Sequence, residues 1–198
     1  MALLFNKPMR KTLGLAAVLF ALLALPTSRG AVERVMITHM LVQIPLLALV
    51  GALAATGLPP RWKARVAEWN AHGIAGTLLA LIASSWWMVP RALDLVLASP
   101  AMEAAKFVTL PLFVGAPLAL SWRQLGGIGR GFVIANALPM WAVAGWLYAA
   151  APVRVCNYYL VDQQVATGLG LLAASLALGV SACVWSFRPV ARPSPLPL

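Results

Sequence analysis

Charged side chains are scarce in this sequence. Of its 198 residues, 15 are Lys or Arg and five are Asp or Glu, whereas 62% are apolar, and the mean hydropathy is +0.86. A soluble domain of this size needs a much larger charged shell, so the composition excludes that class and indicates an integral membrane protein. Nucleic-acid binding needs a basic, water-exposed face, and no segment offers one despite the net charge of +10.

Histidine and cysteine are also rare, with two of each. The sequence contains no CxxC, HExxH, GxSxG, Walker or dinucleotide-binding motif, and no nucleophile–base pair is recognisable, so we expect a protein that is not an enzyme. Cys156 and Cys183 are expected about 40 Å apart along the last span, which excludes a disulfide between them. Cys156 is then a metal ligand, a reactive thiol, a cross-link to a partner or a buried packing residue.

Long hydrophobic runs dominate what is present. Six of them approach the roughly 17–25 helical residues that cross a bilayer. They are continuous rather than alternating, which favours helices over a barrel. The expected fold is all-α, a polytopic transmembrane helical bundle in one domain over residues 1–187, followed by a Pro-rich tail at 188–198. The predicted spans are 12–28, 35–57, 72–90, 104–122, 131–152 and 163–187.

Basic residues divide unevenly between the predicted loops. Ten of the fifteen fall on the side of the N-terminus, which predicts that both termini are cytoplasmic. The loop around residues 58–72 has the composition of an amphipathic interfacial helix on that side, with Trp62 and Trp69 as anchors. The first run also has the pattern of a cleavable signal peptide, which would leave five spans.

One stripe of functional side chains opens the second span. Met36, His39, Met40 and Gln43 are spaced i, i+3, i+4 and i+7 and therefore share one helical face. An imidazole with thioethers is suited to copper, and sulfur favours the cuprous ion. The alternative is structural, because Met fills packing gaps and an intramembrane His can hydrogen-bond a neighbouring helix.

A second polar group opens the last span. Asp162 and Gln163 stand at its start, where a carboxylate either caps the helix or acts as a ligand or an acceptor that orients His39. Gly168 allows a neighbouring helix to approach closely. Glu103 and Lys106, three residues apart, are expected to form an ion pair or to snorkel toward the headgroups.

Three segments carry a family resemblance. "ITHMLVQIPLLALVGA", the run from "NAHGIAGTLLALIASSWW" to "LPLFVGAPLAL", and "LVDQQVATGLGL" resemble the C-terminal part of the CtaG family of bacterial cytochrome c oxidase assembly proteins. The resemblance covers about residues 35–185. His39, Met40 and Pro45 match the family's first motif, and Asp162, Gln163 and Gly168 match its last.

The resemblance implies a multi-pass protein of the bacterial inner membrane that associates with haem–copper oxidase subunits and supplies copper. The metal set expected from these positions is His39, Met36, Met40, Asp162 and Gln163. Family members carry more histidines, some of them where this chain has Glu103 and Lys106, and they are commonly longer. Two alternatives therefore stay open: a non-enzymatic accessory subunit of a larger respiratory complex, and a small transporter, which the scarcity of mid-membrane charge disfavours.

Overall fold

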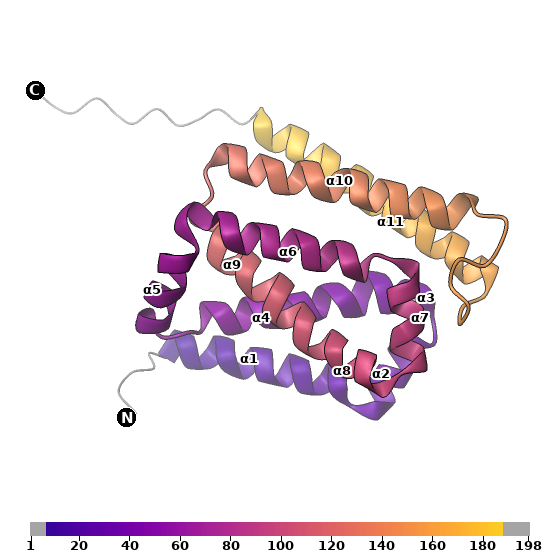
Figure 1. Cartoon of the computed structure of the whole chain (residues 1–198), viewed down its shortest axis with the longest axis horizontal. Helices are drawn as coiled ribbons and strands as arrows, with labels where there is room; N and C mark the ends of the chain where they lie inside the picture. Colours follow the sequence, from indigo (N-terminus) through magenta and orange to yellow (C-terminus); the bar gives the residue numbers. More distant parts are fainter. Residues whose placement is uncertain (1–6, 188–198) are drawn as a thin grey trace, which may run out of the picture.

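The computed structural model describes residues 7–187, and every regular element in that range is helical (Figure 1). In chain order the elements are α1 (Lys7–Ala24), α2 (Pro26–Glu33), α3 (Met36–Thr38), η2 (His39–Gln43), α4 (Ile44–Thr56), α5 (Pro60–Trp69), η3 (Ala71–Gly73), α6 (Ile74–Trp87), α7 (Pro90–Ala98), α8 (Pro100–Thr109), η4 (Leu110–Gly115), α9 (Ala116–Trp122), α10 (Gly127–Ala150) and α11 (Val161–Ser186). The predicted all-α class is confirmed. The predicted tail at 188–198 lies outside the described residues.

Four continuous helices are long and apolar enough to cross a membrane: Met36–Thr56, Pro100–Trp122, Gly127–Ala150 and Val161–Ser186. Two further helix pairs meet the same criteria but are bent, by 68° between α1 and α2 and by 71° between α6 and α7. The protein is therefore a multi-pass membrane bundle of four to six spans. The start of α1 and the end of α11 lie at the same end of the bundle (Figure 1).

Proline explains both bends, which fall inside the predicted spans 12–28 and 72–90. Pro26 and Pro90 each begin the second helix of a pair, and the residues before them, Leu25 and Val89, have extended ψ angles of 130° and 128°. A proline ring excludes the helical region for the preceding residue, so the first helix must end there. Consequently α1 ends at Ala24 and α6 at Trp87.

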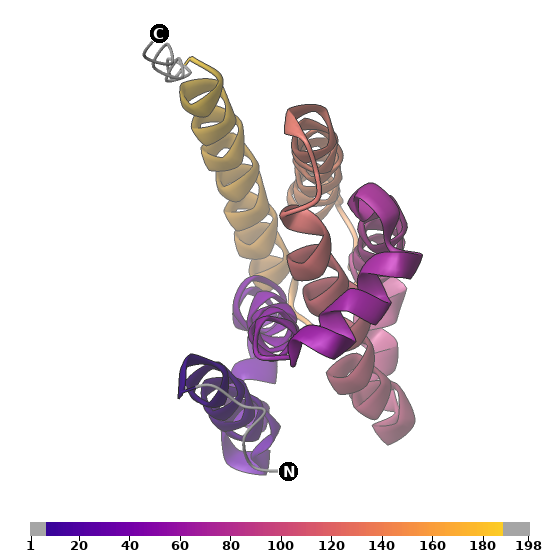
Figure 2. The ribbon, with the colours of Figure 1, turned by 90° about the vertical axis from the view of Figure 1, so that its left-hand side faces the viewer.

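The last two helices form a hairpin that packs through glycine. A Cβ atom on Gly145 of α10 would lie 2.8 Å from the carbonyl oxygen of Gly168, and one on Gly168 would lie 2.6 Å from the amide nitrogen of Ala149. The close approach predicted at Gly168 is thus confirmed. The hairpin lies on the opposite side of the bundle from α1, as Figures 1 and 2 both show.

Two widened helical turns interrupt the second and fourth spans. In η2 the amide of Ile44 bonds to the carbonyl of His39, and in η4 the amide of Ala116 bonds to the carbonyl of Pro111, five residues back in each case. Each wide turn ends two residues before a proline, Pro45 or Pro117. A proline has no N–H and its ring crowds the carbonyl of the preceding turn, and a π turn relieves that conflict without breaking the span.

The amphipathic segment predicted between the second and third spans forms α5, in which Trp62 and Trp69 are both exposed. The chain then reverses sharply into α6, where His72 and Gly73 have φ angles of 56° and 75°. Asn70 stabilises this reversal, because its carboxamide donates to Ser121 Oγ (2.9 Å) and accepts from the amide of Gly76 (2.8 Å).

Candidate functional site

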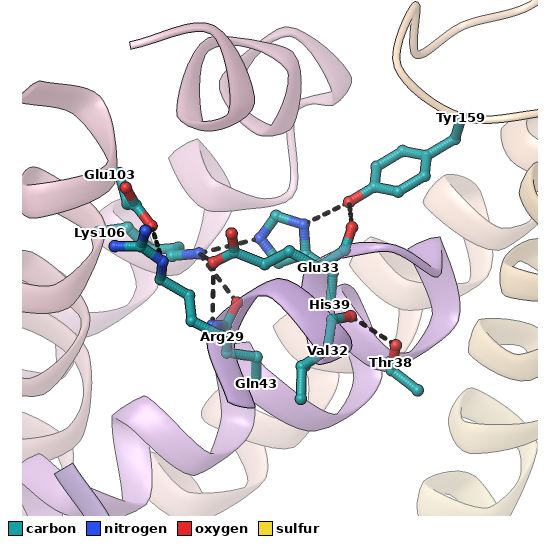
Figure 3. Close-up of polar contacts among 9 residues, drawn as sticks. All are labelled: Arg29, Val32, Glu33, Thr38, His39, Gln43, Glu103, Lys106 and Tyr159. Atoms are coloured by element: carbon teal, nitrogen blue, oxygen red, sulfur yellow. Dashed lines mark hydrogen bonds and ion pairs between the residues drawn. The ribbon is translucent and has the colours of Figure 1, made fainter. Parts of the chain in front are cut away.

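A buried ammonium lies at the centre of the most polar region of the bundle (Figure 3). Lys106 is fully buried, and its Nζ donates to Glu33 Oε1 (2.6 Å), to Gln43 Oε1 (2.9 Å) and to His39 Nε2 (3.2 Å). Lysine has three N–H donors, and each one has an acceptor here. We call Glu33, His39, Gln43, Lys106 and Tyr159 the Lys106 cluster.

The hydrogen-bond network defines the state of the imidazole. Tyr159 donates its hydroxyl proton to the backbone carbonyl of Glu33 (2.9 Å), so its oxygen accepts at 2.7 Å from His39 Nδ1. His39 therefore carries its proton on Nδ1, and the lone pair of Nε2 accepts from Lys106. Both ring nitrogens are occupied, and the imidazole is neutral.

Four separate parts of the chain supply the cluster. Glu33 ends α2, His39 and Gln43 begin and end η2, Lys106 lies in α8, and Tyr159 belongs to the connection between α10 and α11. His39 and Gln43 lie four residues apart on one inward face, and both side chains reach the same ammonium. Gln43 Nε2 also donates to Glu33 Oε1 (3.0 Å), which closes the network.

Further contacts next to the Lys106 cluster fix how α2, α3 and α8 lie against one another. Thr38 donates its hydroxyl to the carbonyl of Val32 (2.6 Å), which fixes the corner between α2 and α3. Beside the cluster, Arg29 forms an ion pair with Glu103 at 2.8 Å. The predicted pairing of Glu103 with Lys106 is therefore wrong: each residue pairs with a side chain of α2 instead, because the corner brings Arg29 and Glu33 over α8.

The connection at residues 151–160 brings Tyr159 to the cluster and is itself held by hydrogen bonds to α7 and α11. The carboxylate of Asp94 accepts the backbone and side-chain N–H groups of Asn157, each at 3.0 Å. Gln164 accepts the amide of Val155 at 2.8 Å. Burial raises the pKa of the Tyr159 hydroxyl, so this residue stays protonated and keeps donating to Glu33.

The structure separates the residues predicted to share a metal site. Met36, His39, Met40 and Gln43 are all buried, as expected for one inward face, but only His39 and Gln43 join the polar cluster. Met36 and Met40 belong to an apolar core cluster with Tyr148, Leu171 and other residues. Their thioethers therefore serve packing in this arrangement.

At the start of α11 the predicted pair is likewise not at the imidazole. Asp162 is exposed in the first turn, and the helix begins after Leu160 without a side-chain cap. The Oε1 atom of Gln163 is buried without a hydrogen-bond partner among the described residues. The neighbouring Gln164 is the side chain that orders the connection, and Tyr159 orients His39 in the role considered for Asp162.

This arrangement does not fit a copper ion at His39. A metal needs a free imidazole lone pair, and the only one is directed at an ammonium 3.2 Å away. A second cation there would meet the Lys106 charge at close range.

Sequence reasoning missed Glu33, Lys106 and Tyr159 as partners of His39. The available signal was Lys106 itself, because a lysine in an apolar span requires acceptors and Gln43 and His39 lie on one inward face.

Comparisons with protein families, with curated proteins and with solved structures found no match to this chain.

Proposed function

We propose that the protein is a non-enzymatic membrane component that binds other membrane proteins during assembly of a haem–copper respiratory oxidase. The observation that carries the non-catalytic part is the closed Lys106 cluster, in which all three ammonium donors and both imidazole nitrogens are already engaged. Such a network joins α2, η2, α8 and the connection before α11, and it leaves the Lys106 ammonium and the His39 imidazole no free donor or acceptor for a substrate. The oxidase as partner is supported by the resemblance of residues 35–185 to the CtaG family.

The surface of the spans suits a protein that works through lateral contacts. Only 17–39% of the most apolar window of each continuous span is buried within the chain. Large side chains such as Trp146, Val143 and Leu176 are exposed on α10 and α11. In a bilayer these faces meet lipid or neighbouring proteins, and van der Waals packing drives helix association there.

Native purification tests this proposal. The full chain is extracted in mild detergent, and co-purifying chains are identified by mass spectrometry. Recovery of haem–copper oxidase subunits is the expected result. Recovery of the chain alone in several detergents, or with an unrelated complex, would reject the oxidase as partner.

A deletion strain separates an assembly factor from an accessory subunit. If the protein acts in assembly, oxidase from cells lacking it is reduced in amount or deficient in haem or copper. If the protein is an accessory subunit, which is the second candidate, the oxidase forms with normal metal content and lacks only this chain.

Copper handling is the further prediction of the sequence, and the arrangement around His39 does not favour it. Cuprous ion is titrated into purified wild type, His39→Ala and Lys106→Met, using a competing chelator. We expect no stoichiometric site that depends on His39 in the wild type. Tight 1:1 binding that His39→Ala abolishes would show that Lys106 leaves the imidazole and would restore the metal site of His39, Met36 and Met40.

A further inference from the structure

An apolar cavity lies between α4 and the α10–α11 hairpin. Its volume is about 350 Å³, within the usual range of small-molecule sites, and Met40, Ala48, Trp87, Met140, Trp141 and Ala174 are among its lining residues. Apart from the indole N–H groups of Trp87 and Trp141, Ser84 carries the only polar side-chain group among the residues that line it. The lining suits a hydrocarbon chain and offers little to an ion or a sugar.

The cavity continues along α4 toward the α5 end of the bundle. A second hollow of about 450 Å³ lies between α4 and α9 and shares Pro45, Ala48 and Val114 with the first. Together they follow η2 and α4 from Met40 to Ala52, roughly 18 Å of helix at 1.5 Å per residue. Because three residues line both hollows, the two adjoin, and we describe them together as one groove.

The groove ends at basic side chains. Trp122 and Arg123 line the far end of the second hollow, and Arg123 also lines an adjoining hollow of about 310 Å³ together with Lys63. No acidic residue lines either hollow. An apolar channel that opens beside two cations is complementary to an amphiphile with a negative head and a hydrocarbon tail.

We infer that this groove binds one anionic phospholipid, with an acyl chain between α4 and the hairpin and its phosphate at Arg123 and Lys63. The inference rests on the membrane location and is independent of the proposed partner. The lipid fills space between two helix layers that a neighbouring side chain does not fill, and its headgroup lies in the leaflet on the α5 side.

Native mass spectrometry of the full chain in mild detergent tests the site with two probes of identical acyl chains, phosphatidylglycerol and phosphatidylcholine. We expect one phosphatidylglycerol to be retained, with a preference of roughly 25-fold if two basic residues each contribute a factor of about five. Arg123→Gln should lower that preference about fivefold. Arg65→Gln, which removes the same charge from exposed α5 without touching the groove, is the matched control.

Two variants that fill the groove from opposite walls test the acyl site. Ala48→Phe on α4 and Ala174→Phe on α11 should each abolish retention of both lipids, whereas Val143→Phe on the exposed face of α10 should leave retention unchanged. Each variant is first shown to be monodisperse by size-exclusion chromatography, and the second Phe variant covers failure of the first to fold.

Three results would overturn the inference. Equal retention of the two lipids by the wild type removes headgroup recognition. Equal loss with Arg65→Gln and Arg123→Gln reduces the effect to general charge. Unchanged retention in both Phe variants, or a co-purifying membrane protein that those variants release, assigns the groove to another occupant.

Discussion

The two widened turns, η2 and η4, both occur before a proline, but η2 presents polar side chains to its neighbours and η4 presents a glycine. Both precede a proline, and both keep a span continuous where an α-helix would break. At η2 the turn directs His39 and Gln43 to a buried charge. At η4 it brings Gly115 against the backbone of Ala48 in α4. A π turn is therefore not a functional signature by itself, and the side chains it carries decide its role.

The largest effect is expected for Lys106, whose ammonium bonds to His39 and Gln43 of η2. Lys106→Met leaves the largely buried Glu33 carboxylate without its charged partner, so the free energy of unfolding should fall by about 3–5 kcal/mol. Denaturation in mixed SDS micelles measures the change. Lys11→Met at an exposed position of α1 is the control and should change it by less than about 0.5 kcal/mol.

A second substitution should partly restore the stability of the Lys106→Met variant. Adding Glu33→Gln to Lys106→Met replaces the unpaired carboxylate with a neutral amide, so part of the lost stability should return. If Lys106→Met is as stable as the wild type, the ion pair beside η2 does not stabilise the bundle, and the contrast with η4 disappears.

The next largest effect tests the apolar turn. A Cβ on Gly115 would overlap the carbonyl of Ala48, a backbone atom that cannot rotate away, so Gly115→Ala should destabilise the protein by about 1–3 kcal/mol. Gly131→Ala in α10 is the matched control, because no atom lies within 4 Å of its added methyl group. Equal stability of the two variants would show that α4 and η4 do not approach this closely.

A smaller effect is expected at the tyrosine that orients His39. Tyr159→Phe removes the acceptor for His39 Nδ1–H and the donor to the Glu33 carbonyl, and should cost about 1–2 kcal/mol. Tyr158→Phe is a precise control because that side chain is 57% exposed. A loss in Tyr158→Phe as large as in Tyr159→Phe would contradict the network around η2.

The last prediction concerns the thiol of Cys156, in the connection at residues 151–160, and its readout is a labelling rate. Burial raises the pKa of the Cys156 thiol to about 12, so almost none of it is thiolate near neutral pH. Maleimide labelling of a Cys183→Ser variant should therefore be slow in the folded protein and become fast on unfolding. Rapid labelling at pH 7 would mean that the connection at residues 151–160 opens and exposes Cys156.

Much of the fold follows from local chemistry. Apolar runs identify the spans, and the prolines at 26 and 90 mark where two of them bend, although run length alone extends the predicted ranges across both bends. The small residue Gly168 correctly indicates helix contact. Orientation in the membrane stays a prediction from the distribution of basic residues.

The site was harder to predict because its partners are distant in sequence. Helical spacing places His39 and Gln43 on one inward face, but Lys106 is 67 residues from His39 and Tyr159 is 120 residues away. Local spacing assigned Lys106 to Glu103, three residues distant. Only the corner at α2, where the chain turns back over α8, makes Glu33 the nearer carboxylate.

The bends also give the molecule unequal hydrophobic lengths. The 14 residues of α6 extend roughly 21 Å before α7 turns across the end of the bundle, whereas the 26 residues of α11 extend roughly 39 Å. A bilayer of uniform thickness cannot match both, so it thins beside one and thickens, or the helix tilts, beside the other. Lipids around the protein are thereby sorted by chain length, with short chains favoured next to α6 and long chains next to α11.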